Sequence, residues 1–216
     1  MSKKADSADS LSGIKEYWDK RAKCGKNDND RVEQNRRPQL MRYETFLHGH
    51  DLTGKSILDI GCGTGELLAH LYRRGIRCRY KGVDLSGEMI QLCRQKFPES
   101  EFEETDVLVD DLSEQFDYTI SVGIHNVKFS GNREILEKMT RRQFELCRVA
   151  AHVSILTNRY DGFADHIQAW CAEDVLKLAL SITPYAVLRH DYLPNDFSVT
   201  LYREPLIDTC KDLLLD

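Results

Sequence analysis

The sequence predicts an α/β fold, a doubly wound sheet that is mostly parallel and has one antiparallel strand. Three observations predict it. Apolar strand-like segments alternate with helical segments five times along the chain, and the first of these strands passes into its helix through a turn rich in glycine. The chain then ends its folded part with two alternating segments split by Pro194-Asn195-Asp196, which is a hairpin signal. Repeats of this kind followed by a hairpin are typical of a parallel sheet with an antiparallel strand near one end.

Two segments precede the first strand. Residues 14–24 predict a short helix with two aromatic side chains, and the polar residues 25–37 predict a mobile loop. From Pro38 to Leu47 the apolar residues recur at helical spacing, so we expect this helix to pack on the core. Residues 1–13 are rich in Ser and Asp and are expected to be disordered, because they can bury little apolar surface.

The repeats then follow in order. Ser86 is expected to cap the second helix of the repeats, and Pro98 to stop it. The third strand is rather polar, which indicates a sheet edge. The predicted strands are 57–60, 80–84, 101–106, 116–122, 151–156, 185–193 and 197–203, and the predicted helices between them are 66–75, 87–97, 133–147 and 173–182.

Length, charge and cysteine content exclude several classes of protein. A chain of 216 residues fits one α/β domain. A net charge of −5 argues against non-specific binding to nucleic acid or anionic membrane. The seven cysteines include no C-x-x-C pair, which indicates reduced thiols, no metal site and a cytoplasmic location. No apolar stretch approaches the ~20 residues that span a bilayer, and residues 1–13 lack the apolar core of a secretory signal.

The glycine turn at 59–65, Asp-Ile-Gly-Cys-Gly-Thr-Gly, predicts a ligand site. Alternating glycines let the backbone approach a ligand closely, and the following helix presents unpaired N–H groups there. The dinucleotide pattern G-x-G-x-x-G would place its last glycine at position 66, but Glu66 stands there and would repel a pyrophosphate. Asp59, two residues before the first glycine, suits a ligand with an ammonium group. A glycine-rich turn without any ligand is the alternative.

The pattern Asp59-x-Gly61-x-Gly63-x-Gly65 resembles motif I of the class I S-adenosylmethionine-dependent methyltransferases, and the similarity extends over nearly everything from Pro38 on. The resemblance implies a Rossmann-like seven-stranded sheet with strand order 3-2-1-4-5-7-6. It also implies a single methyltransferase domain at 38–216 and a lid helix and loop at 14–37. Residues 158–160 and 189–192 resemble a bacterial small-molecule subgroup.

The same resemblance assigns cofactor residues to the carboxyl ends of the strands, where ligands of such sheets bind. Asp84 would accept hydrogen bonds from both ribose hydroxyls, unless it is only a turn acid. Asp106 would accept from the adenine amino group. Several acids near one crevice repel each other unless a cation joins them, and the sulfonium and ammonium groups of S-adenosylmethionine would do so. The residues expected to bind the cofactor are Tyr17, Arg42, Asp59, Gly61, Cys62, Gly63, Gly65, Asp84, Leu85, Met89, Asp106, Val107, Ser121 and Val122.

Some of these assignments have equally good alternatives. Leu85 and Met89 would wall the purine, but ordinary helix packing fits their spacing as well. Arg42 is the candidate for the cofactor carboxylate, although a surface arginine fits the same helix. Tyr17 and Trp18 resemble an aromatic lid, and aromatic residues at this spacing also occur in packed helices.

His125, in the loop after the fourth strand, is the candidate catalytic base, because an imidazole titrates near neutral pH. It could instead only shape the loop. Trp18, His125, Asn126, His190 and Tyr192 are the expected substrate residues. His190 and Tyr192 lie on one face of a strand, which faces either the substrate or the solvent.

The predicted activity is methyl transfer from S-adenosylmethionine to an oxygen or nitrogen of a small metabolite, a biosynthetic intermediate or a sugar-like compound. The Asn/Asp-Pro-Pro-Tyr signature of nucleobase amino methylation is absent, and with the acidic charge this speaks against nucleic acid substrates. The alternatives are a non-catalytic cofactor-binding regulatory subunit and, less favoured, an NAD-dependent oxidoreductase. We expect no membrane partner, and a monomer or a homodimer.

Overall fold

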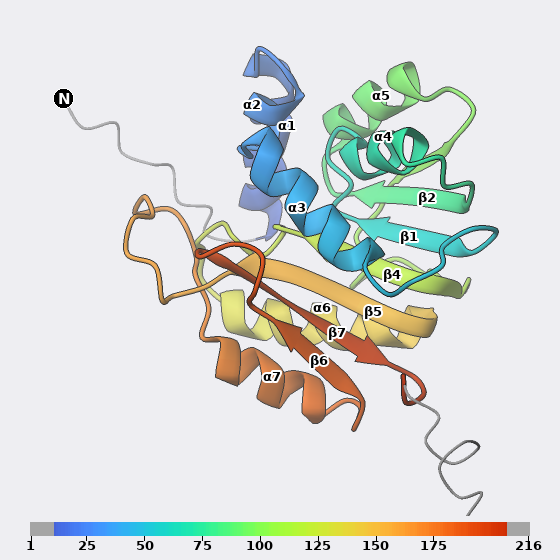
Figure 1. The fold of residues 1–216 in the computed structure, drawn as a ribbon. Coiled ribbons are helices and arrows are strands. Elements are labelled where there is room, and N and C mark those ends of the chain that lie inside the picture. The colour runs from blue at the N-terminus through green and yellow to red at the C-terminus, as the bar shows by residue number, and fades with distance from the viewer. Residues whose placement is uncertain (1–10, 207–216) are drawn as a thin grey trace, which may run out of the picture.

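A computed structural model describes residues 11–206 of the chain as a seven-stranded sheet between two layers of helices (Figure 1). The strand order is β3-β2-β1-β4-β5-β7-β6. The first five strands pair in parallel, and β7 is antiparallel to both β5 and β6. The predicted fold class, strand order and single antiparallel strand are therefore confirmed. Residues 1–10 of the expected N-terminal tail lie outside the described range.

The strands and helices have the following bounds. The strands are β1 Ser56–Ile60, β2 Arg79–Asp84, β3 Glu101–Glu104, β4 Phe116–Val122, β5 Cys147–Leu156, β6 Ala186–Arg189 and β7 Asp196–Tyr202. The helices are α1 Leu11–Cys24, α2 Asp28–Arg31, α3 Arg36–Leu47, α4 Glu66–Arg73, α5 Gly87–Lys96, α6 Asn132–Leu146 and α7 Ala172–Leu180.

The largest differences from the expected elements lie before the first strand. Helix α1 begins at Leu11, inside the expected tail, and the expected loop 25–37 contains the short helix α2. The side chain of Asn27 caps α2 by accepting a hydrogen bond from the backbone N–H of Asp30. Helix α3 starts two residues before Pro38. This proline is tolerated because the first N–H groups of a helix have no intrahelical partner, so its missing N–H costs nothing there.

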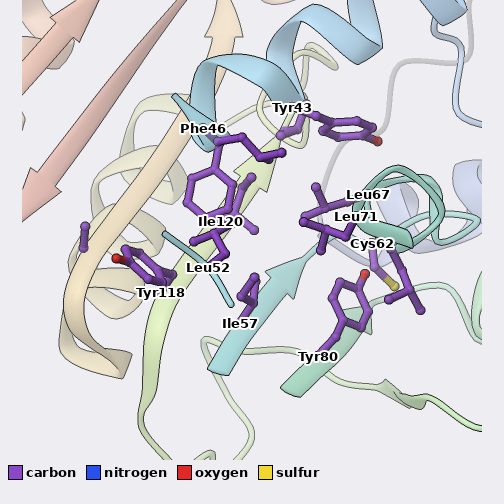
Figure 2. Close-up of a cluster of buried hydrophobic side chains, with 14 of the residues drawn as sticks. Tyr43, Phe46, Leu52, Ile57, Cys62, Leu67, Leu71, Tyr80, Tyr118 and Ile120 are labelled. Carbon is purple, nitrogen blue, oxygen red and sulfur yellow. The ribbon is translucent and has the colours of Figure 1, made fainter. Parts of the chain in front are cut away.

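Both faces of the sheet are covered, as parallel sheets require. All five residues of β1 are buried, and successive side chains point to opposite faces. Ile57 joins a cluster with α3, α4 and α5, whereas Leu58 joins one with α6. Figure 2 shows the first cluster, in which Phe46 of α3 packs edge-on against Tyr118 of β4 with ring centroids 5.9 Å apart. A third cluster joins α6 and α7 to β5 and β7.

The parallel register brings the carboxyl ends of β1, β2, β3 and β4 to one edge of the sheet. Helices α1 and α2 lie beyond that edge (Figure 1). Between residues 11 and 206 no helix is both long and apolar enough to cross a membrane. The six cysteines in this range are free thiols, and Cys210 lies outside it.

Candidate functional site

The glycine turn after β1 has the backbone conformation that its sequence suggests. Gly61 and Gly63 have φ angles of 71° and 54°, in the left-handed region. A Cβ on Gly61 would stand 2.1 Å from Ile124 Cγ2, and one on Gly63 would stand 2.8 Å from Val32 Cγ1. The turn is therefore pressed between the loop after β4 and the segment that follows α2. Larger residues would displace both.

A cavity with an empty volume of about 1090 Å³, partly open to solvent, lies at this edge of the sheet. Ligands of open α/β sheets bind at this edge, outside the carboxyl ends of the strands. Among the residues that sequence reasoning assigned to the site, those that line this first cavity are Trp18, Asp59, Gly61, Cys62, Gly63, Asp84, Leu85, Met89, Asp106, Val107, Val122 and His125.

Asp84 ends β2 with a carboxylate held in place by the backbone. Its Oδ2 accepts the N–H of Gly63 at 2.9 Å, and its Oδ1 accepts the N–H of Ser86, also at 2.9 Å. Burial raises the pKa of Asp84, and these two hydrogen bonds partly offset that rise. A carboxylate has about four acceptor positions, so it can still accept hydrogen bonds from a ligand in the cavity.

Asp59, at the end of β1, lies deeper and is 4% exposed. Its Oδ2 accepts a hydrogen bond of 2.6 Å from the Tyr80 hydroxyl. Burial raises the pKa of Asp59 to about 7, the bond from Tyr80 opposes the rise, and the charge of Asp84 adds to it. Within residues 11–206 neither carboxylate forms a salt bridge. Two neighbouring acids without a cation of their own favour a cationic ligand.

Two buried polar atoms in the cavity wall have no hydrogen-bond partner among the described residues: Thr105 Oγ1 and His125 Nε2. Such atoms are rare in folded proteins and are usually satisfied by a ligand or water. Burial lowers the pKa of His125 to about 3, so its ring is neutral at physiological pH. The expectation that it titrates near neutrality does not hold, because the ring is 3% exposed. An imidazole with so low a pKa is a weak base, so His125 is better suited to hydrogen bonding than to proton removal.

Arg42 does not line the first cavity. Its Nε donates to Asp196 Oδ2 at 2.6 Å, and its Nη1 donates to Gln34 Oε1 at 2.9 Å. Both charged groups are buried, so removing either would leave the other uncompensated. Tyr192, an expected substrate residue, donates its hydroxyl to the same Asp196. The guanidinium is therefore bound by groups of the protein itself. We do not retain Arg42 as the residue that binds the cofactor carboxylate.

Other expected residues also lie away from the first cavity. Gly65 has a positive φ, but it faces Phe97 and Cys93. Ser121 is buried and accepts a hydrogen bond from Gln143. Tyr17 packs edge-on against Trp18 with ring centroids 5.1 Å apart. His190 packs against Phe197, at 6.1 Å between centroids.

A second cavity adjoins the first one and has an empty volume of about 800 Å³. The two share Trp18, Val32, Gln34 and Gly123 as walls. Apolar side chains and several amides also line the second cavity, and one of these amides is the expected substrate residue Asn126. The residues of these two walls that sequence reasoning missed include Ile14, Val32, Gln34, Thr105, Ile124 and Phe163. Most come from segments without any recognisable motif.

Several polar contacts hold helix α1 over the site. Lys15 Nζ donates to the Leu85 carbonyl at 3.0 Å and to Glu104 at 2.7 Å. Ser86 donates to Asp19 at 2.6 Å. Ile14 and Ala22, on the same helix, are buried, so apolar packing adds to these polar contacts. No group of three or more His, Cys, Asp or Glu within 11–206 is placed to hold a metal ion.

Comparison with known proteins gives a consistent result. Residues 57–143 match the family model described as a methyltransferase domain. The malonyl-[acyl-carrier protein] O-methyltransferase of Acetivibrio thermocellus is 39% identical over 82 residues, which are 36% of this chain and 29% of that protein. The magnesium-protoporphyrin O-methyltransferase of Rhodobacter capsulatus is 33% identical over 76 residues, 33% of each chain. The matches thus span about a third of these relatives' length.

Among solved structures, the magnesium protoporphyrin IX methyltransferase from Synechocystis PCC 6803 with bound SAH superposes with a TM-score of 0.68. That match covers 90% of this chain and 100% of the other, at 15% identity. An O-methyltransferase family protein from Burkholderia thailandensis has a TM-score of 0.64, with 82% and 58% of the two chains covered at 14% identity. At these identities the similarity concerns the fold.

Proposed function

We propose that this chain, which has the class I methyltransferase fold and carries a methyltransferase domain, binds S-adenosylmethionine in the first cavity and methylates a small molecule in the second. The observation that carries the proposal is the pair Asp59 and Asp84. These carboxylates adjoin one cavity, burial raises the pKa of both, and neither forms a salt bridge with a described residue. A sulfonium nucleoside with an ammonium group matches both, whereas the phosphates of NAD would be repelled.

Different residues of the first cavity would bind different parts of the cofactor. Asp84 is positioned to accept both ribose hydroxyls, and Asp59 to pair with the ammonium group. Asp106 and Val107 would hold the adenine, between the apolar walls formed by Leu85 and Met89. Thr105 Oγ1 and His125 Nε2 are free to bond polar atoms of the bound molecules.

The bound cofactor supplies an activated methyl group on its sulfonium. The protein aligns the acceptor with that methyl group and excludes water. The walls shared by the two cavities include Trp18 of α1 and two residues that follow α2, Val32 and Gln34. The acceptor is a small metabolite whose oxygen or nitrogen atom faces the first cavity. No nucleic acid is involved in this proposal.

Isothermal calorimetry tests the cofactor assignment directly. S-adenosylmethionine and its demethylated product are expected to bind at micromolar Kd, which corresponds to about −8 kcal/mol. NAD is expected not to bind. Because Asp59 has a pKa of about 7, binding of the cationic cofactor should tighten from pH 5.5 to pH 7 as this carboxyl loses its proton. The Asp59→Asn variant should lose that pH dependence. Binding of NAD in preference to the sulfonium compound would contradict the proposal.

A further inference from the structure

Glu33 has an unusual backbone conformation. With a φ of 51° it is the one residue other than glycine with positive φ in the described part of the chain. Such a conformation costs roughly 1–3 kcal/mol and persists only where the surroundings enforce it. Here the turn after α2 enforces it, since the next residue, Gln34, donates its N–H to the Asn29 carbonyl at 3.0 Å. Residues held in this way cluster at functional sites.

The Glu33 side chain is oriented by groups from two other segments. Its Oε1 lies 3.4 Å from Arg21 Nε, and the Tyr17 hydroxyl hydrogen-bonds the carboxylate. Both partners belong to α1. Its Oε2 lies 3.9 Å from Nε2 of His166, in the segment between β5 and α7. Three neighbours therefore fix a carboxylate that is one-quarter exposed.

Glu33 is also the single acid in the wall of the second cavity, within residues 11–206. The one cation in that wall, Arg42, is paired with Asp196. The remaining wall is made of amides such as Asn126 and Asn195 and of apolar side chains such as Phe163. The wall therefore has no unpaired cation that could bind an anionic molecule. It has one carboxylate that could accept a proton.

We propose that Glu33 accepts the proton of the methyl acceptor, and that the acceptor is therefore an uncharged compound with a hydroxyl group. This inference rests on the proposed function. In the step, the acceptor oxygen forms a bond to the methyl carbon while the carbon–sulfur bond breaks and its electron pair stays on sulfur. The hydroxyl proton passes to Glu33, which later releases it to solvent. A hydroxyl needs such help because it is a poor nucleophile, whereas a carboxylate acceptor has no proton to lose and finds no unpaired cation in this wall.

The test compares phenol with benzoate, two probes with the same ring, on the protein saturated with S-adenosylhomocysteine. Calorimetry should show phenol binding at least tenfold more tightly than benzoate. In Glu33→Gln this preference should shrink because the carboxylate that accepts the phenol hydroxyl is gone. With S-adenosylmethionine, Glu33→Gln should lower kcat for phenol methylation by ~10²–10⁴-fold with little change in KM, the usual effect of losing a general base.

Three variants separate the carboxylate from other effects. Glu33→Asn lacks the acid but tolerates the left-handed backbone, so it should be as slow as Glu33→Gln. Glu33→Asp should recover part of the rate. Glu16→Gln removes an exposed acid of α1 outside both cavities and should leave kcat unchanged.

The outcomes distinguish the two proposals. Failure of the wild-type protein to bind S-adenosylhomocysteine would overturn the proposed function. If that compound binds, the cofactor site stands. The assignment of Glu33 is then overturned if benzoate binds as tightly as phenol, if neither probe binds, if bound phenol is not methylated, or if Glu33→Gln methylates it at the wild-type rate.

Discussion

Replacing Asp84 with alanine is expected to weaken S-adenosylmethionine binding by about 10- to 150-fold. Hydrogen bonds to charged groups contribute roughly 1.5–3 kcal/mol, and we propose that this carboxylate accepts both ribose hydroxyls. The change also removes the acceptor of the Gly63 N–H, which holds the glycine turn, so the loss should lie toward the upper end. Isothermal calorimetry with S-adenosylmethionine and with its demethylated product measures it.

Two further variants make that measurement specific. Asp84→Asn keeps an acceptor oxygen for only one of the two backbone N–H groups, so it should lose affinity as well, through the missing charge and one lost backbone hydrogen bond. Asp174→Asn removes an acid of α7 that lies outside both cavities and should bind like the wild type. An affinity that stays unchanged in Asp84→Ala would remove this residue from the ribose role.

Replacing Asp59 with asparagine is expected to stabilise the cofactor-free protein at pH 8 by up to about 4 kcal/mol. The folded-state pKa of about 7 lies above the ordinary aspartate pKa of 3.8, and each pKa unit of difference corresponds to about 1.4 kcal/mol. Below pH 4 the carboxyl is protonated in both the folded and unfolded states and costs nothing. As the pH rises from 4 to 7 the folded state holds the proton more tightly, so the stability of the wild type falls. Above pH 7 the full cost remains.

Urea unfolding of both proteins at pH 4.5 and pH 8 tests this expectation. The asparagine side chain can still accept the hydrogen bond from Tyr80, so the variant isolates the charge. Its advantage should be small at pH 4.5 and large at pH 8. If the two proteins differed in unfolding free energy by the same amount at both pH values, the charge of Asp59 would not destabilise the folded protein. The variant should also bind the cationic cofactor more weakly, which would explain why a destabilising acid occupies this position.

Local sequence patterns were sufficient for the fold and for placing Asp59 and Asp84 in the wall of one cavity. Strand β4 begins and ends where its apolar residues predict, and the glycine turn opens α4 at Glu66. Asp59 and Asp84 both end strands that pair in parallel, so their meeting at one edge follows from the strand order. These predictions hold because they depend on contacts within a few residues and on the regular geometry of a parallel sheet.

Long-range contacts determined the rest of the site. Arg42 looked like a ligand-binding cation, but its partner Asp196 is 154 residues away in the chain. His125 looked like a base, but burial lowers its pKa to about 3 and makes it a weak one. Glu33 stood in an unremarkable polar segment, and only the turn after α2 places it beside Tyr17, Arg21 and His166. Charge and protonation depend on burial and on neighbours from distant segments, and a linear pattern does not contain either.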